Sequence, residues 1–231
     1  MAGVVVMGIF VADAAYRADR LPRMGETVLG YGFALGPGGK GSNQAVAAAL
    51  AGAETTMLTR LGTDDFGEMA RRLWAGAGVR DLSIAVADGA TGSAFIFLEE
   101  GTGNNAIIVA QGAAADISTD DVDAWGTAID AADVFVTQLE QPLDAARAGL
   151  ARAKRGGAIT VLNPAPAADL DDALLATCDY VTPNEAEAEA LTGIAVHGPN
   201  EAARAAELLV ARGAGVTIVT LGGQGVLVHD G

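Results

Sequence analysis

The strongest constraint on the fold is a repeated order in which a short apolar segment is followed by a helix-forming segment. In the second half of the chain we expect strands at residues 133–139, 158–162, 180–182 and 216–220, and helices at 142–155, 184–191 and 200–212. The helices are expected to stop at Gly156, Gly193 and Gly213, because glycine ends helices readily. This alternation predicts an α/β protein with a parallel sheet and helices on both faces.

The first half of the chain begins with the same pattern. Residues 4–9 form a continuous apolar run, which is typical of a strand covered on both faces. A helix is expected at 42–51 with Ser42 as its N-cap, followed by a strand at 55–60 and a helix at 65–77.

Two segments, about 11–35 and 91–110, break this rhythm because they are β-like and contain no crossover helix. Residues 94–98 and 106–110 flank a Gly/Asn turn, which predicts a hairpin. We expect one small sheet that projects from the edge of the main sheet. The alternative is a pair of surface hairpins without a role.

The amino-acid composition limits the kinds of partner that the chain can bind. The 231 residues are 51% hydrophobic, and they contain no apolar run long enough to span a bilayer. A net charge of −15 argues against nucleic acid as a partner, although it does not exclude ATP. The one cysteine, Cys178, cannot form an internal disulfide and fits a reducing compartment. We therefore predict a cytoplasmic protein with no membrane partner.

A glycine-rich stretch at 36–41 runs into an alanine-rich helix. It formally satisfies G-x-G-x-x-G, but a dinucleotide turn should directly follow the first core strand. It is not a P-loop either, because Ser42 does not directly follow Lys40. A nicotinamide-dependent oxidoreductase remains an alternative that rests on this stretch alone.

Polar or glycine residues follow several of the expected strands. In open α/β sheets the carboxyl ends of the strands meet at one edge, where ligands bind. These residues are Asp13, Glu140, Asn163, Asn184, Glu187, Thr220, Gly222 and Gly225.

Their chemistry suggests a polyol and a phosphate. An ionised carboxylate such as Asp13 accepts hydrogen bonds from a pair of sugar hydroxyls, and Lys40 and Asn43 add donors. Asn184 and Glu187, three residues apart on one helical face, can orient water on Mg²⁺ near a phosphate.

Each of these side chains also has a structural alternative. Asp13 can cap a turn or helix, and Lys40 can be a solvated charge. Glu140 can cap the helix that follows it, and Asn184 with Glu187 can form a capping box. The two histidines are isolated, so no zinc site is indicated.

Eight short motifs occur in one order along the chain: residues 25–27, 38–47, 62–67, 138–140, 163–166, 182–189, 191–193 and 220–225. Together they resemble the ribokinase family of carbohydrate kinases (PfkB type), over essentially the whole chain. The resemblance implies a three-layer αβα sandwich with a mostly parallel sheet and a β-lid, ATP-dependent phosphorylation of a sugar hydroxyl, and Mg²⁺.

The resemblance also implies roles for individual residues within one kinase domain at 1–231. The sugar would be held by Asp13, Gly39, Lys40, Asn43 and Glu140. The nucleotide would be held by Asn184, Thr220, Gly222 and Gly225, with Glu187 acting on Mg²⁺ through water. Residues 11–35 and 91–110 would be the lid, which in this family pairs two subunits into a homodimer.

The sequence departs from the family pattern in two ways. The family has Asn two residues before the sugar-binding Asp, and here that residue is Val11, so the sugar need not be ribose. The family's Gly-Ala-Gly-Asp turn, which carries the catalytic base, is absent up to Gly231.

We therefore predict no catalytic residue within these 231 residues and expect the C-terminal part of the fold, with the base and a site for a monovalent cation such as K⁺, beyond Gly231. The chain alone is then expected to be inactive. A non-catalytic sugar-binding relative is the alternative function.

Overall fold

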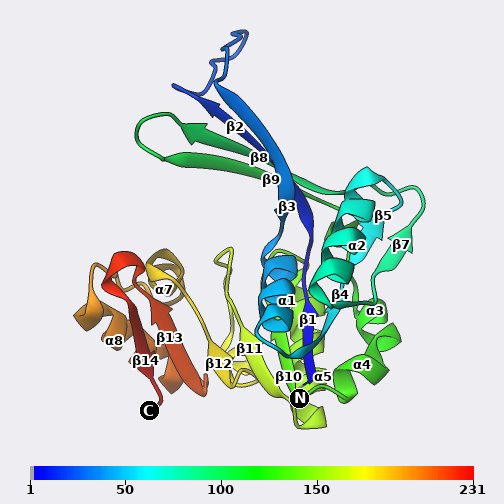
Figure 1. Cartoon of the computed structure of the whole chain (residues 1–231). Coiled ribbons are helices and arrows are strands. Elements are labelled where there is room, and N and C mark those ends of the chain that lie inside the picture. Colours follow the sequence, from blue (N-terminus) through cyan, green and yellow to red (C-terminus); the bar gives the residue numbers. More distant parts are fainter. Residues whose placement is uncertain (1–2) are drawn as a thin grey trace.

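The structure is a computed structural model that describes residues 3–231. Its centre is an eight-stranded sheet in the order β14-β13-β12-β11-β10-β1-β4-β6, parallel throughout except for the β13–β14 pair. Helices cover both faces, which gives three layers (Figure 1). The predicted α/β fold with a mostly parallel sheet is confirmed.

The strands of this sheet are β1 (Gly3–Met7), β4 (Glu54–Leu58), β6 (Arg80–Asp81), β10 (Val134–Thr137), β11 (Ile159–Leu162), β12 (Tyr180–Val181), β13 (Val216–Thr220) and β14 (Val226–His229). The α-helices are α1 (Lys40–Leu50), α2 (Asp65–Ala77), α3 (Thr119–Ala124), α4 (Gly126–Asp130), α5 (Leu143–Gly156), α6 (Asp172–Leu175), α7 (Glu185–Thr192) and α8 (Pro199–Ala211). Short 3₁₀ turns lie at η1 (Ala113–Asp116) and η2 (Gly222–Gln224), and β5 (Arg60–Gly62) pairs with β7 (Ile84–Val86). No helix within residues 3–231 combines the length and apolar character needed to cross a bilayer.

The apolar run of β1 places side chains into two separate cores. Val5 and Met7 pack with residues of α3, α4 and α5 on one face of the sheet. Val6 packs on the other face with residues of α1 and α2, among them the fully buried Trp74. A strand buried on both faces needs such a continuous apolar sequence, as expected for a parallel sheet.

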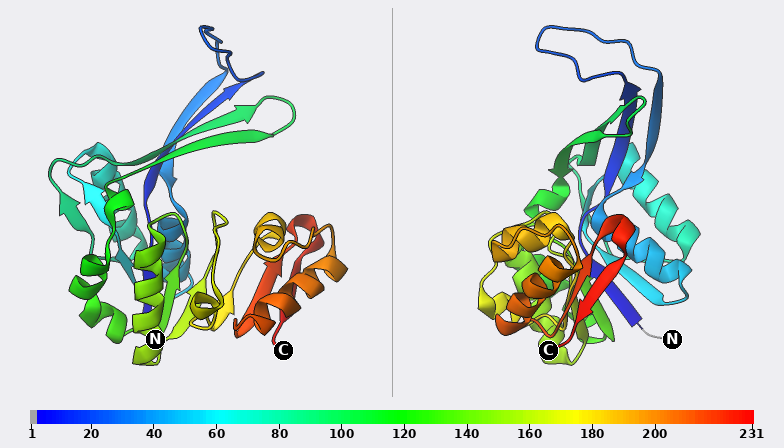
Figure 2. Two further views of the ribbon diagram at one scale, coloured as in Figure 1. Left: turned by 180° about the vertical axis from the view of Figure 1, so that it is seen from behind. Right: turned by 90° about the vertical axis from the view of Figure 1, so that its left-hand side faces the viewer.

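The second sheet has four strands in the order β3-β2-β8-β9 and extends away from the body of the molecule (Figures 1 and 2). Its strands are β2 (Val11–Ala18), β3 (Gly32–Gly38), β8 (Thr91–Glu99) and β9 (Asn105–Gly112). The two hairpins are joined by a parallel pairing of β2 with β8. The prediction of a small second sheet is therefore confirmed.

The first strand is shorter than predicted. It ends at Met7, and the chain enters the small sheet at Val11. Asp13 consequently lies inside β2, paired with Gly36 of β3, and not at the carboxyl end of a main-sheet strand. The interpretation of Asp13 as a residue of the main-sheet edge was wrong.

The start of α1 also differs from the prediction. The helix begins at Lys40, and Gly39 precedes it with a φ of 90°, a conformation that glycine adopts at little cost. Ser42 is not an N-cap; its hydroxyl accepts a hydrogen bond of 3.0 Å from the indole nitrogen of Trp74. Because both groups are buried, the indole N–H requires this partner.

Other elements were missed or displaced. Helix α5 includes Gly156, and Gly157, with a φ of 87°, is the C-cap. Residues 113–130 form η1, α3 and α4, none of which was predicted, although Ser118 and Asp121 make a capping box at the start of α3. The antiparallel edge strand β14 was also missed.

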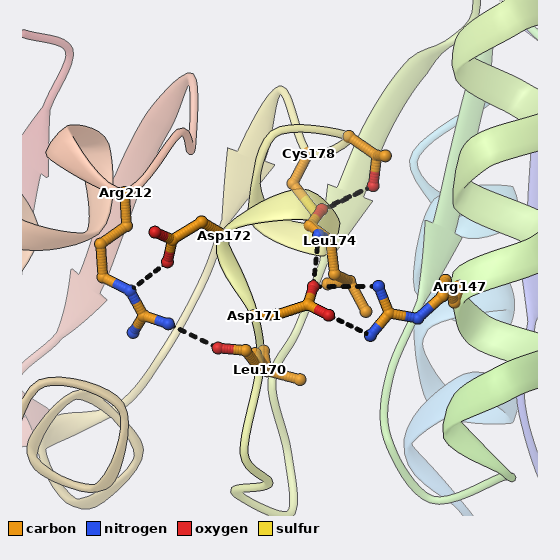
Figure 3. Close-up of polar contacts among 8 residues, drawn as sticks. Arg147, Leu170, Asp171, Asp172, Leu174, Cys178 and Arg212 are labelled. Carbon is orange, nitrogen blue, oxygen red and sulfur yellow. Dashed lines mark hydrogen bonds and ion pairs between the residues drawn. The ribbon is translucent and has the colours of Figure 1, made fainter.

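Two arginines hold the segment around α6 in place. Arg147 of α5 makes two hydrogen bonds to the carboxylate of Asp171, and Arg212 pairs with Asp172 and donates to the carbonyl of Leu170 (Figure 3). The contacts reach this segment from both sides, so they fix it between α5 and the end of α8. Residues just before this segment contribute to the cavity described below.

Replacing Ser42 by alanine should lower the free energy of unfolding by about 1–3 kcal/mol, because the buried indole N–H of Trp74 would lose its acceptor. Urea denaturation of the variant measures this effect.

The double variant Ser42→Ala/Trp74→Phe serves as the control, since it removes the orphaned donor as well. If the hydrogen bond is the cause, Ser42→Ala should lower the free energy of unfolding less in the Trp74→Phe background than in wild type. Equal costs in both backgrounds would contradict this explanation.

Candidate functional site

A cavity of about 690 Å³ lies between the small sheet and the carboxyl edge of the main sheet. Seven of the ten site residues predicted from the sequence line it, and they come from four separate segments of the chain. These residues are Asp13, Gly39, Lys40, Asn43, Glu140, Asn184 and Glu187.

Asp13 faces this cavity from β2. Its carboxylate lies against Gly38 of the adjoining strand, where even a Cβ atom would come within 2.2 Å of a carboxylate oxygen. Burial raises the pKa of the Asp13 carboxyl above its ordinary value. No hydrogen bond to this carboxylate is formed within residues 3–231, so it is not a cap, and its oxygens are available to a ligand.

The start of α1 forms the floor of the cavity. Lys40 is the first residue of the helix and Asn43 lies one turn into it. Gly39 allows this close approach, because a Cβ there would lie 2.5 Å from the carbonyl oxygen of Ile9. The N-terminal end of a helix carries partial positive charge from its macrodipole, which favours anionic or oxygen-rich ligands.

Glu140 connects this floor to the main sheet. Its carboxylate accepts a hydrogen bond of 2.8 Å from the backbone N–H of Lys40, one hundred residues away in sequence. The sequence alternative, that Glu140 caps the following helix, is wrong: α5 has Pro142 at its N-cap position and no side-chain cap. The pKa of the Glu140 carboxyl is raised above its ordinary value, and burial is the largest cause. The hydrogen bond and the positive charge of Lys40 lower this pKa, whereas the negative charge of Asp13 raises it.

Asn184 and Glu187 form the predicted capping box at the start of α7. The Asn184 side chain accepts from the backbone N–H of Glu187, whose carboxylate accepts from the Asn184 backbone and side-chain nitrogens. Both residues also line the cavity. A carboxylate has about four acceptor positions, so Glu187 keeps capacity for a water molecule.

The other three predicted residues do not reach the wall of this cavity. Thr220 ends β13 and bridges to Asn184 through the backbone. Gly222 and Gly225 follow it in and after η2, and Gly222 approaches the carboxylate of Glu185. The structure therefore brings Thr220 and Gly222 beside the start of α7, but none of the three residues lines the cavity.

The sequence interpretation missed Gln111, which lines the cavity from β9 and donates through its side-chain amide to the backbone carbonyl of Glu140. The sequence contained the signal, because Ile107, Val109 and Gln111 are spaced by two residues and therefore lie on the same face of the strand. Gln138 was predicted only as part of the motif at residues 138–140. It is fully buried, and its amide donates to the side chain of Gln44 in α1.

A metal cage made wholly of protein ligands is not visible in the described part of the chain, residues 3–231, which contains no group of three His, Cys, Asp or Glu side chains arranged to hold an ion. Mg²⁺ often binds instead through one or two carboxylates, waters and substrate phosphates. The Asn184 and Glu187 pair is compatible with that mode.

Comparison with known proteins places these features in a family. The profile of the pfkB family of carbohydrate kinases matches residues 1–231. Ribokinase of Mus musculus is 38% identical over 229 residues, covering 98% of this chain and 71% of that protein. Ribokinase of Haemophilus influenzae is 37% identical over 226 residues, covering 97% and 74%.

A solved structure gives the same result for the fold. Ribokinase of Arabidopsis thaliana, complexed with ribose and ATP, superimposes with a TM-score of 0.87 at 28% identity and covers all of this chain and 75% of that one. The chain belongs to the PfkB family of carbohydrate kinases.

Proposed function

We propose that this chain binds a small sugar and ATP in and beside the cavity, and that the protein transfers phosphate from ATP to a hydroxyl of a ribose-like pentose or a related sugar or nucleoside. The observation that carries this proposal is the convergence of seven predicted site residues from four chain segments on one hollow. The binding of ribose and ATP by the Arabidopsis ribokinase supports it.

In this proposal Asp13 accepts hydrogen bonds from a pair of sugar hydroxyls, and Lys40 and Asn43 donate to others. A desolvated carboxylate without a protein partner gains most from such hydroxyls. Gly39 and Glu140 also border the sugar. Gly39 lets the start of α1 pack against the backbone of Ile9, and Glu140 holds that start in place.

The nucleotide phosphates lie next to the sugar in this proposal. Asn184 and Glu187 hold Mg²⁺-bound water at the cavity, and Thr220, Gly222 and Gly225 border the nucleotide. Mg²⁺ would neutralise phosphate charge during transfer. The small sheet acts as a lid over the sugar within one kinase domain.

We assign no general base among residues 3–231. The cavity carboxylates Glu140 and Glu187 already cap helix starts, and Asp13 is assigned to the sugar. Binding is therefore the decisive measurement for this chain. The rival function, a sugar-binding relative that transfers no phosphate, predicts stabilisation by sugar without any effect of ATP.

The change Asp13→Ala should abolish sugar binding and leave ATP-Mg²⁺ binding intact, because Asp13 contributes to the sugar half alone. Thermal unfolding and calorimetry with a panel of pentoses, hexoses and nucleosides measure both, since a ligand stabilises the folded state that binds it.

Wild-type protein that binds no member of the panel would overturn the proposed function. An equal loss of both ligands in the variant would overturn the role of Asp13 only.

Sugar affinity should weaken as the pH falls, and it should do so at a higher pH than an ordinary aspartate would cause. Burial raises the pKa of Asp13 above 3.8, and the protonated form accepts hydroxyl donors less well. The same shift implies that ionised Asp13 destabilises the unliganded protein. This loss of stability is fully present above the pKa of Asp13 in the folded protein, and it vanishes below the pKa of Asp13 in the unfolded chain.

The variant Asp13→Asn tests the sign of this effect. Without ligand it should melt at a higher temperature than wild type near pH 7, and the difference should shrink as the pH is lowered. A lower melting temperature at pH 7 that recovers on acidification would contradict the raised pKa.

We also propose that the small sheet pairs two copies of the chain through its face opposite to the cavity. This face carries exposed apolar side chains from all four strands: Tyr16, Phe33, Leu35, Phe95 and Ile108. Phe33 is 59% exposed and Ile108 69% exposed, and the rings of Tyr16 and Phe33 lie 5.0 Å apart. An apolar patch of this kind is typical of a protein interface.

The double change Phe33→Glu/Ile108→Lys should convert a dimer to a monomer in sedimentation velocity at micromolar concentration, since it places charges on the apolar face. Leu50→Asp, at a residue that is 74% exposed on α1, is the matched control and should leave the dimer intact. A wild-type protein that sediments as a monomer would contradict this proposal.

A further inference from the structure

The wall that the small sheet presents to the cavity is almost entirely apolar. It is formed by Val11, Ala94, Ile96, Ile107 and Val109, together with two polar side chains, Asp13 and Gln111. A sugar presents hydroxyls in several directions, and each hydroxyl that faces only apolar groups loses its hydrogen bonds with water. Gln111 is therefore the one polar group besides Asp13 that this wall offers within residues 3–231.

Gln111 and Val11 lie on either side of Gly92. Val11 pairs with Gly92 across the β2–β8 ladder, and Gly92 lies close to the carbonyl of Gln111 on β9. Gly92 itself places no side chain between them. This row lies one step, about 7 Å along the strands, from the row that contains Asp13.

The orientation of the Gln111 amide follows from its partner. A backbone carbonyl can only accept, so the side-chain nitrogen of Gln111 must face the carbonyl of Glu140. The side-chain oxygen then points elsewhere, and it accepts no hydrogen bond within residues 3–231. Because the amide is held at one end and half-buried, its free acceptor is pre-oriented beside the sugar site.

Resting on the proposed sugar-kinase function, we infer that Gln111 is a specificity-determining residue of the sugar site: its side-chain oxygen accepts a hydrogen bond from a hydroxyl that neighbours the pair held by Asp13. Val11 provides no such acceptor, so the recognition of that hydroxyl depends on β9. Gln111 also links the small sheet to Glu140 and thereby to the start of α1. The ligand class is a sugar with at least three adjacent hydroxyls.

The test compares the best-binding sugar of the panel with its single-deoxy analogues by calorimetry, in wild type and in Gln111→Leu. Wild type should bind one deoxy analogue about fivefold more weakly than the parent sugar, because that analogue lacks the hydroxyl that donates to Gln111. Analogues that lack a hydroxyl held by Asp13 should also bind more weakly. In Gln111→Leu that one preference should disappear, while the preferences that depend on Asp13 persist.

The ratio of the affinity for the parent sugar to the affinity for each deoxy analogue separates recognition from a purely structural role. If Gln111 only held Glu140 in place, its loss would lower the affinity for all sugars alike and leave every ratio unchanged. That result would overturn the inference. Asn105→Leu is the matched control, because Asn105 lies on the same face of β9 but outside the cavity. Its ratios should equal those of wild type.

Two further results complete the test. If Gln111→Leu does not fold, Gln111→Ala replaces it and must lose the same single preference; retention of that preference would overturn the inference. Wild-type protein that binds no sugar would instead refute the proposed function, so the two failures are distinguishable.

Discussion

The hydrogen bond from the backbone N–H of Lys40 to the carboxylate of Glu140 is the contact on which the site depends. It fixes the start of α1 against the segment that follows β10, although the two residues are one hundred positions apart. The contact is possible because glycines pack closely here: the Cβ of any other residue at Gly41 would come within 2.8 Å of the Cα of Gly8. The carboxylate also favours the positive end of the helix dipole.

The cavity is electrostatically costly without a ligand. Asp13 and Glu140 are both partly desolvated, and each has a pKa above its ordinary value. Glu140 recovers part of this cost through the helix start, whereas Asp13 has no hydrogen-bonding partner among the described residues. Binding sites commonly give up stability in this way, because a group that is satisfied within the protein has less to gain from a ligand.

The sequence predicted much of the main fold because hydrophobic periodicity and glycine stops act locally. It predicted the capping box of Asn184 and Glu187 for the same reason, since its members are three residues apart. It did not predict η1, α3 and α4, which are too short for a clear helical period. Ser42 was misassigned because its partner, Trp74, lies 32 residues away and only burial creates the need for it.

By itself, the sequence determined the class of fold, the order of its main strands and helices, and most of the polar residues that line the cavity. Only the tertiary structure decided that Asp13 reaches the cavity from the small sheet, that Glu140 caps a distant helix, and that Gln111 adds an amide to the apolar wall. Local propensity and periodicity are encoded within a few neighbouring residues. The partners of Glu140 and Gln111 are set by sheet register and by the packing of α1 against the strands, which depend on the whole chain.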